Sequence, residues 1–323
     1  MDLSDSPYKP RIAVVGSGAV GCYYGGKLAA AGHDVHFLMR ADLDAVRKNG
    51  LRIRSTEAPE MILSNVNAYG STGEIGPVDL VLIALKTTSN EALDTLIPPL
   101  LHPGTMLVTL QNGLGNEDYL STHFGVRRVM GALCFVCLNR VAPGVIQHFG
   151  HGTISIGEYR GLAKPRTHQL AGALREAGIE ANVVDDLITE RWRKLVWNVP
   201  FNGLSIAAGE ITTDLILADP GLEELVRGLM REVVAIAAAH GHDIPASYID
   251  FQIERTLPMG SYHPSSLLDY WAGLPVEVES IWGEPLREAQ KIGLDAGRLE
   301  ALYYLLKRLT AARLERVAEI PQA

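Results

Sequence analysis

Near the start of the chain stands the segment Ile12-Ala-Val-Val-Gly16-Ser-Gly18-Ala-Val-Gly21. Four apolar residues run into the pattern G-x-G-x-x-G, which is typical of the first strand, turn and helix of a dinucleotide-binding domain. Gly16 permits a tight turn, Gly18 lets the backbone approach a pyrophosphate, and Gly21 lets the helix pack closely on the sheet. The N–H groups that open the helix would face the anion. We therefore predict a dinucleotide at Gly16, Ser17, Gly18, Ala19, Val20 and Gly21.

Arg40 is the residue that would determine the preference between the two nicotinamide coenzymes, NAD and NADP. In an NAD site an acidic residue usually ends the second strand and accepts a hydrogen bond from the ribose 2′-OH. This chain has Arg40 at that place, and a guanidinium offers two donors and a full charge to a 2′-phosphate. Asp42 lies close enough to leave NAD open, and a surface arginine is the structural alternative. We predict NADPH/NADP⁺ as the cofactor.

Composition limits the classes of protein that fit. The chain has 323 residues, more than a usual single domain, with 47% hydrophobic and 20% charged residues, as in globular proteins with a large core. A net charge of −8 without a long basic run argues against nucleic acid or an anionic membrane as partner. No apolar run reaches the length of a membrane span, and the first nine residues lack the features of a signal peptide. We expect a cytoplasmic location.

The three cysteines are too few for a disulfide framework. Cys134 and Cys137 form a C-x-x-C pattern, which raises the question of a zinc or redox site. Their apolar setting is typical of a buried strand, and no second cysteine pair exists for zinc. We expect buried thiols and no metal.

The first part of the chain alternates strand and helix patterns, which indicates a parallel sheet with helices on both faces. The predicted strands are Arg11–Val15, Asp34–Met39, Asp79–Leu85 and Thr105–Leu110, with an edge hairpin from Leu51–Arg54 and Met61–Val66. Later come two strands joined by a turn, a helix and a last strand: Arg127–Cys137, Pro143-Gly144, Val145–Ile156, Arg166–Ala177 and Ala181–Val184.

After Asp186 the strand signals vanish, and apolar residues recur at spacings of three and four. The predicted helices are Leu187–Ala207, Leu222–His240, Ile249–Arg255, Ser266–Arg287 and Leu299–Ala318. We therefore predict an α/β Rossmann-type N-terminal domain with a parallel sheet, residues 1–185. An all-helical C-terminal domain, residues 186–323, would bind the substrate. Its helices 222–240 and 299–318 could form a homodimer or pack only the core.

Polar residues at four places could carry chemistry. Lys86 follows an apolar strand, where ligands gather in parallel sheets, although a surface lysine is equally compatible. Asn112-Gly113 follows the next strand and, taken alone, favours an ordinary turn. Lys194, Asn198 and Asn202 share one face of an otherwise apolar helix, so they must face partners or a cleft. A solvated basic edge of Arg191, Arg193 and Lys194 is the alternative, against which the two asparagines argue as indifferent helix formers.

The same helix contains Pro200, which removes an N–H and should kink it.

The fourth place begins at Pro264-Ser265, which is typical of a helix start with N-cap chemistry. Glu277 lies eight residues after Asp269 and would share its helical face.

Together these motifs resemble the ketopantoate reductase (2-dehydropantoate 2-reductase) family, from Ile12 to about Leu306. The resemblance is carried by G-x-G-x-x-G, Lys86, Gln111-Asn112-Gly113, Arg193-Lys194-Leu-x-x-Asn198-x-x-x-Asn202 and Ser265-x-x-x-Asp269 followed by Glu277-Val-Glu279. It implies a Rossmann-type domain, a helical domain and NADPH.

The resemblance also implies roles for single residues. The glycine-rich segment, Arg40 and Lys86 would hold the dinucleotide, with the backbone near Val136 also in contact. Lys194 would be the catalytic acid, and Asn112 would lie between cofactor and substrate. Further substrate contacts would come from Lys194 itself, Asn198, Asn202 and Ser265, and Glu277 would contact the cofactor on its nicotinamide ribose side.

The chemistry that follows is reduction of a 2-oxo acid to a 2-hydroxy acid, with 2-dehydropantoate to pantoate, in pantothenate biosynthesis, as the preferred case. A lysine beside the ketone oxygen both stabilises the growing negative charge and supplies the proton of the alcohol. Thr212 falls where the family often has a further asparagine, and Trp197 and Pro200 stand where smaller residues are usual. These departures leave a paralogous reductase for another 2-oxo acid as an alternative. A non-catalytic NADPH-binding regulator is the third hypothesis.

Overall fold

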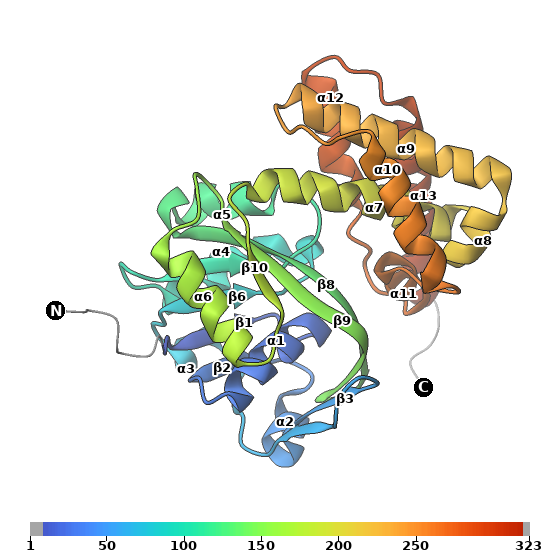
Figure 1. Ribbon diagram of the computed structural model, residues 1–323. Helices are drawn as coiled ribbons and strands as arrows, with labels where there is room; N and C mark the ends of the chain where they lie inside the picture. Colours follow the sequence, from blue (N-terminus) through green and yellow to red (C-terminus); the bar gives the residue numbers. More distant parts are fainter. Residues whose placement is uncertain (1–8, 319–323) are drawn as a thin grey trace. The chain divides into compact units, whose positions relative to one another are not determined.

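The computed structural model describes residues 9–318, and most of the polar N-terminal segment lies outside this range (Figure 1). The chain divides into two compact units. One comprises the residues up to Gln111 together with Asn116–Leu187, and the other comprises Asn112–Gly115 together with the residues from Ile188 onward. The first unit is α/β with a mostly parallel sheet and the second is helical, which confirms the predicted fold class.

The α/β unit is built on a ten-stranded sheet with the order β4-β3-β9-β8-β7-β6-β1-β2-β5, and β10 pairs with β9. Its central strands are parallel and fully buried, as their short apolar runs predict. They are β1 (Ile12–Val15), β2 (Val35–Leu38), β6 (Leu80–Ile83) and β7 (Met106–Thr109). The first strand pairs with β2 on one side and with β6 on the other, so the glycine-rich turn leaves the middle of the sheet.

Two hairpins extend this sheet. The edge hairpin is confirmed as β3 (Leu51–Ser55) and β4 (Met61–Leu63), which pair antiparallel. The long hairpin of β8 (Val129–Ala142) and β9 (Val145–Glu158) turns at Gly144, which has a φ of +68° (Figure 1). The strand β10 (Ala181–Val183) is also confirmed, whereas β5 (Asn67–Tyr69) was not predicted because three residues show no periodicity.

The helices of this unit follow their strands in chain order. They are α1 (Ala19–Ala30), α2 (Leu43–Asn49), α3 (Thr72–Ile75), η1 (Thr87–Ala92), α4 (Leu93–Leu96), η2 (Pro98–Leu100), α5 (Asn116–Phe124), η3 (Val126–Arg128) and α6 (Pro165–Glu176). At the end of β9 the buried carboxylate of Glu158 accepts hydrogen bonds from Lys164, Arg166 and Thr167 at the start of α6. Burial raises the pKa of Glu158, but these hydrogen bonds outweigh burial and lower it overall.

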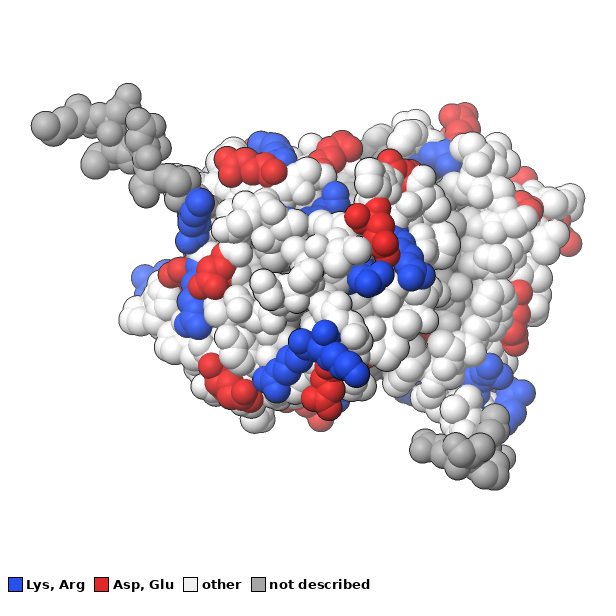
Figure 2. All heavy atoms as spheres, turned by 90° about the horizontal axis from the view of Figure 1, so that it is seen from below, with Lys and Arg blue, Asp and Glu red and all other residues white. Residues whose placement is uncertain are grey.

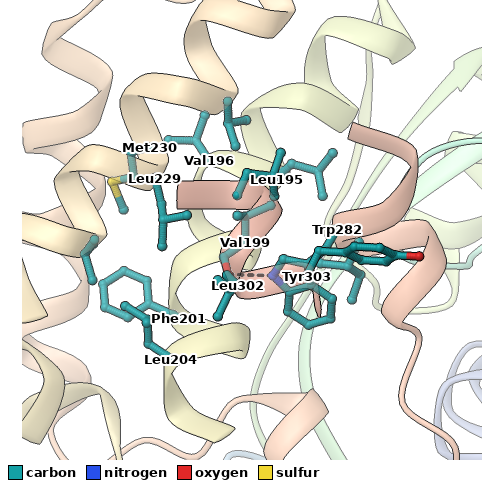
Figure 3. Packing of buried hydrophobic residues seen from close by; sticks show 14 of the residues in the cluster. Leu195, Val196, Val199, Phe201, Leu204, Leu229, Met230, Trp282, Leu302 and Tyr303 are labelled. Carbon is teal, nitrogen blue, oxygen red and sulfur yellow. Dashed lines mark hydrogen bonds between the residues drawn. The ribbon is translucent and has the colours of Figure 1, made fainter. Parts of the chain in front are cut away.

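The helical unit packs around α7 (Leu187–Ala207), which continues through Pro200. The other elements are α8 (Thr213–Ala218), α9 (Pro220–Ala239), α10 (Ser247–Thr256), η4 (Leu257–Met259), α11 (Ser265–Trp271), the π-helix η5 (Glu279–Gly283), α12 (Glu284–Lys291) and α13 (Gly297–Ala318). Figure 3 shows the core around α7, where Val196 and Val199 lie near Leu229, Leu302 and Trp282.

One predicted helix is wrong. The segment Ser266–Arg287 is not continuous, because the chain leaves α11 at Gly273 with a φ of +65° and meets Pro275 before η5 begins. A positive φ ends a right-handed helix, and proline lacks the N–H that would continue it. Asp269 and Glu277 therefore do not share one helical face.

The prediction for the cysteine pair is wrong in one respect. Cys134 and Cys137 lie on β8 as expected, but both are half-buried rather than buried, while Cys22 is buried. None of the three forms a disulfide. Within residues 9–318, no group of three or more potential metal ligands comes together, and no helix is long and apolar enough to span a bilayer.

Candidate functional site

The glycine-rich turn has the geometry that an anion-binding loop needs. Gly16 has a φ of +102°, and a Cβ there would lie 2.3 Å from the backbone nitrogen of Leu85. A Cβ at Gly21 would lie 2.2 Å from the carbonyl oxygen of Gly16, so both positions exclude any side chain. At Gly18, by contrast, a Cβ would meet nothing within 4 Å, which leaves open space beside the turn.

The helix that follows this turn presents its N-terminus without a competing anion. Gly18 is the N-cap of α1, no side chain caps the helix, and its first turn carries no acidic residue. The side chain of Ser17 donates to the carbonyl oxygen of Leu38 at 2.8 Å, which ties the turn to the end of β2. The backbone N–H groups and the positive end of the helix dipole are thus suited to bind a pyrophosphate.

Arg40 and Asp42 differ sharply in their surroundings. Arg40 is exposed two residues after β2. Asp42 is buried, and its carboxylate accepts hydrogen bonds from Arg140 Nη1 at 2.6 Å and from the backbone N–H of Gly144 at 3.1 Å. The carboxylate of Asp42 therefore serves to hold the turn of the long hairpin, whereas the guanidinium of Arg40 faces solvent.

Lys86 and Val136 lie at two further places in the α/β unit. Lys86 is exposed between β6 and η1. Val136 is half-buried on β8 and stands next to a register shift against β9. Sequence reasoning missed the part played by Gln111, whose Nε2 donates to the carbonyl oxygen of Leu85 at 2.9 Å and to Asn90 Oδ1 at 2.7 Å. These bonds join the ends of β6 and β7, which carry Lys86 and the 112–115 segment.

In the helical unit, Lys194 and Asn112 come together. Lys194 Nζ donates to Asn112 Oδ1 at 2.7 Å, a charge-assisted hydrogen bond. The segment that carries Asn112 is seated on η5, because Leu114 N–H donates to the Ser280 carbonyl oxygen at 2.9 Å. Gly113, with a φ of +83°, permits this approach, since a Cβ there would lie 2.3 Å from the same oxygen. Asn112 thus orients the amine of Lys194.

One helical turn further on, Asn198 is nearly buried as a residue, and its amide forms no hydrogen bond to the described residues. The residue is 7% exposed, and nothing within residues 9–318 pairs with its side chain. Its polar atoms are not fully buried and stay open to hydrogen bonds from a ligand. Asn198 is therefore suited to hold a polar group of a substrate.

Asn202 and Ser265, which lie 63 residues apart, also meet. Asn202 is 2% exposed, and its Oδ1 accepts from Ser265 Oγ at 3.4 Å and from the backbone N–H of Ser266 at 3.0 Å. The expected N-cap role of Ser265 is wrong: Pro264 is the N-cap of α11, and no side chain caps this helix. The hydroxyl of Ser265 is turned to Asn202 instead.

Glu277 is 5% exposed and lies just before η5. Its backbone carbonyl accepts from Ser280 Oγ at 3.4 Å, so it belongs to the same short segment that seats Asn112. The structure therefore places Glu277 through the π-helix and not through the helical periodicity that the sequence suggested.

The core holds α7 in place beneath these polar groups. The indole N–H of Trp282 donates to the Val199 carbonyl oxygen at 2.9 Å, drawn as a dashed line in Figure 3. Trp282 is fully buried and belongs to η5. The π-helix thus anchors α7 through Trp282 and the 112–115 segment through Ser280, which makes it the element that aligns Lys194 with Asn112.

Two of the unusual residues have definite surroundings. Trp197 donates from Nε1 to Thr256 Oγ1 at 2.8 Å, and its ring lies 5.0 Å from that of Phe201 and 6.1 Å from that of Tyr262. Thr212 donates its hydroxyl to Asp214, which also accepts from Ser261 at 2.8 Å. The partner of Trp197 is 59 residues away, so no sequence signal could have identified it.

Charge is mixed on the face of the molecule that Figure 2 views. Figure 2 shows Lys and Arg interspersed with Asp and Glu on the face that it views, and among the coloured residues no extended basic area covers that face. A nucleic-acid-binding surface would gather basic side chains on one face or along one helix.

Comparison with known proteins gives consistent matches along the chain. The model of the family described as ketopantoate reductase PanE/ApbA matches residues 12–161, and the model of its C-terminal part matches residues 186–310. The chain is 40% identical to 2-dehydropantoate 2-reductase of Nostoc sp. over 304 residues, which is 93% of this chain and 95% of the relative.

Solved structures agree with these matches. The crystal structure of 2-dehydropantoate 2-reductase from Geobacter metallireducens GS-15 superposes with a TM-score of 0.90 at 44% identity, over 92% of this chain and 99% of that one. A D-mandelate dehydrogenase with NADH and anilino(oxo)acetate superposes with a TM-score of 0.85 over 94% of this chain and 98% of that one. At 21% identity this second likeness concerns the fold alone.

Proposed function

The chain belongs to the ketopantoate reductase family of oxidoreductases, and we propose that it reduces 2-dehydropantoate to pantoate with NADPH, a step of pantothenate biosynthesis. The observation that carries this proposal is the pair formed by Lys194 and Asn112, one turn from the unpartnered amide of Asn198. A positioned amine beside an amide that lacks its hydrogen bonds is the arrangement that binding and protonating a 2-oxo acid requires.

The residues of the α/β unit fit a dinucleotide. The open space at Gly18 and the uncapped N-terminus of α1 suit the pyrophosphate. The exposed guanidinium of Arg40 suits a ribose 2′-phosphate, and the alternative for a 2′-OH, Asp42, is buried and already bound by Arg140. We infer that NADPH is preferred over NADH, with Lys86 and the backbone near Val136 as further contacts and Glu277 on the nicotinamide ribose side.

When bound, the nicotinamide supplies the hydride that adds to the ketone carbon. Negative charge then grows on the ketone oxygen, and Lys194 Nζ stabilises this charge and transfers one proton to form the alcohol. Asn112 holds the amine by its 2.7 Å hydrogen bond, so the amine is oriented before the substrate binds. Asn198, Asn202 and Ser265 would orient the carboxylate and hydroxyl groups of the substrate. Acid catalysis of this kind contributes about 10²–10⁴-fold in rate.

The proposal is tested by following NADPH oxidation by the purified protein with a panel of 2-oxo acids, ranked by kcat/KM. We expect 2-dehydropantoate to rank first and NADH to give a much lower kcat/KM than NADPH. NADPH binding without turnover of any 2-oxo acid would favour the regulator hypothesis instead.

The alternative is a reductase of the same kind that prefers another 2-oxo acid. The observation in its favour is Trp197, whose large indole is fixed by Thr256 three residues after the proposed catalytic lysine. If this indole limits the room for the substrate side chain, Trp197→Ala will improve kcat/KM for bulkier 2-oxo acids relative to 2-dehydropantoate. An unchanged ranking, with the protein still folded, would exclude Trp197 as the residue that selects the substrate.

We also propose a homodimer through the helical unit and a cytoplasmic location. The observation behind the dimer is an apolar groove of about 450 Å³ on α7, α9 and α13, bordered by Leu222, Leu225 and the exposed Leu305. Light scattering should give twice the chain mass, and Leu305→Glu should halve it. A monomeric parent protein would refute the dimer. That none of the three cysteines forms a disulfide is compatible with a reducing compartment.

A further inference from the structure

A second cavity lies within the α/β unit, away from the glycine-rich turn. It has a volume of about 820 Å³ and is bordered by the second half of α1, the β3–β4 hairpin, the middle of β9 and the end of α6. It shares no residue with the segment 16–21. Neither the family resemblance nor the proposed reaction uses it.

The floor of this cavity contains a hydroxyl without a partner. Tyr23 is 3% exposed, and nothing within residues 9–318 hydrogen-bonds to its oxygen. The ring is held by His148, whose ring centroid lies 4.9 Å away, and a Cβ at Gly152 would lie 2.7 Å from the Tyr23 oxygen. The Tyr23 oxygen is open to the cavity rather than fully buried, so a hydroxyl held this firmly can donate a hydrogen bond to a ligand.

Lys27 lies beside it, one helical turn along α1. Its Nζ donates to the Gly178 carbonyl oxygen at 3.1 Å and lies 5.3 Å from the centre of the Tyr23 ring. No carboxylate of the described residues forms an ion pair with this ammonium, and partial burial lowers its pKa. Tyr23 and Lys27 therefore offer a neutral and a charged donor to an anionic group.

Backbone strain marks the same cavity. His151 has a φ of +63° between Gly150 and Gly152, at a register shift where β8 residues Phe135 and Val136 face Thr153 and His151. Gly152 is therefore the extra residue of a bulge. A left-handed conformation is costly for a residue other than glycine and is retained where it aims a side chain or the backbone at a site.

The rim carries the opposite charge. Glu57, Glu176 and Glu180 all border the cavity and are exposed, and Glu180 is placed by a 3.2 Å hydrogen bond from Thr153. A simple anion would be repelled by these carboxylates, and a simple cation would leave the donors on the floor unused. A molecule with one charge of each sign satisfies both.

We propose that this cavity is a second small-molecule site, which binds a zwitterion of the amino-acid class. The carboxylate of the ligand is held by Tyr23 and Lys27, and its ammonium group lies at Glu57 and Glu180. The proposal is independent of the reductase activity.

Calorimetric titration of the full chain tests this site. The probes are glycine, 3-aminopropanoate, 4-aminobutanoate and 6-aminohexanoate, with propanoate and propylamine as analogues that carry one charge. We expect saturable binding of at least one zwitterion and none of the two analogues. The spacing of the charges in the preferred probe then reports the distance between floor and rim.

Three variants locate the site. Tyr23→Phe and Lys27→Met should each weaken binding by about tenfold or more, as the loss of a hydrogen bond to a charged group predicts. Glu57→Gln changes an exposed residue, for which little effect on the fold is expected, and should also weaken binding. Tyr304→Phe and Lys48→Met are the matched controls and should bind as the parent does.

Three results would overturn the proposal. The first is that no zwitterion binds at concentrations up to roughly 20 mM, the limit for a weak but specific site. The second is that a singly charged analogue binds as tightly as the preferred zwitterion. The third is that folded Tyr23→Phe and Glu57→Gln bind the zwitterion with unchanged affinity. Because no oxo acid or coenzyme is used, the outcome is separate from that of the reductase assays.

Discussion

The substitution Lys194→Gln tests the proposed acid with the least change in shape. The glutamine side chain is one atom shorter but keeps an N–H donor directed toward Asn112 Oδ1, which Lys194 Nζ contacts at 2.7 Å. What it loses is the positive charge and the transferable proton. Loss of acid catalysis costs about 10²–10⁴-fold in rate, which corresponds to about 3–5 kcal/mol in the activation barrier.

We therefore expect kcat for 2-oxo acid reduction to fall by about two to four orders of magnitude, with the affinity for NADPH unchanged within about twofold. Steady-state kinetics gives kcat and KM, and calorimetry gives the coenzyme affinity. Lys194→Arg keeps a positive charge and N–H donors but holds its protons tightly, so its kcat should also fall. Lys48→Gln, at an exposed lysine of α2, is the matched control and should behave as the parent protein.

Two results would refute this reasoning. If Lys194→Gln keeps kcat within about threefold of the parent, Lys194 is not the acid. If the change raises KM while kcat stays constant, Lys194 binds the substrate but does not protonate it. A melting temperature of the variant equal to that of the parent would show that the change in kcat arises at the site and not from loss of the fold.

Other residues give further predictions. Arg40→Ala should narrow the preference for NADPH over NADH about tenfold or more, because it removes a charge-assisted contact to the 2′-phosphate; an unchanged ratio of the two kcat/KM values would exclude this role. Gly18→Ala should weaken coenzyme binding but leave the melting temperature nearly unchanged, because the new Cβ meets only open space. Gly21→Ala should lower the melting temperature, because its Cβ would lie 2.2 Å from a carbonyl oxygen. The lowered pKa of Glu158 means that its ion pairs stabilise the fold fully above about pH 4.5 and lose this effect as the pH falls through the folded-state pKa. Urea unfolding at several pH values should therefore show a weaker loss of stability in acid for Glu158→Gln than for the parent, and parallel pH profiles would refute the assignment.

The local sequence pattern predicted the structure correctly where the pattern arises from a single helix, strand or turn. The apolar run into G-x-G-x-x-G predicts β1, the turn and α1, because the positive φ of Gly16 and the close approach of Gly21 are demands of consecutive residues. The spacing of Lys194, Asn198 and Asn202 likewise follows from the period of one helix. The glycine pattern and the helical spacing can both be read without knowledge of the rest of the chain.

Pattern failed where the chain path interrupts an element. Asp269 and Glu277 have the right spacing for one face, but the positive φ of Gly273 and the ring of Pro275 separate them. The thiols of Cys134 and Cys137 stand in an apolar run, yet both are half-buried, because alternation along a strand does not reveal how much of each face is covered. Burial depends on neighbours that the local sequence does not contain.

By itself, the sequence determined the fold class, the central strands and the residue types available for chemistry, since these follow from periodicity and from backbone preferences over a few residues. Only the tertiary structure decided which of those residues meet. Lys194 and Asn112 are 82 positions apart, and they are aligned because the π-helix anchors α7 through Trp282 and seats the 112–115 segment through Ser280. The physical reason is that hydrogen bonds and close packing act over a few ångströms in space, and the path of the folded chain alone determines which distant residues come within that range.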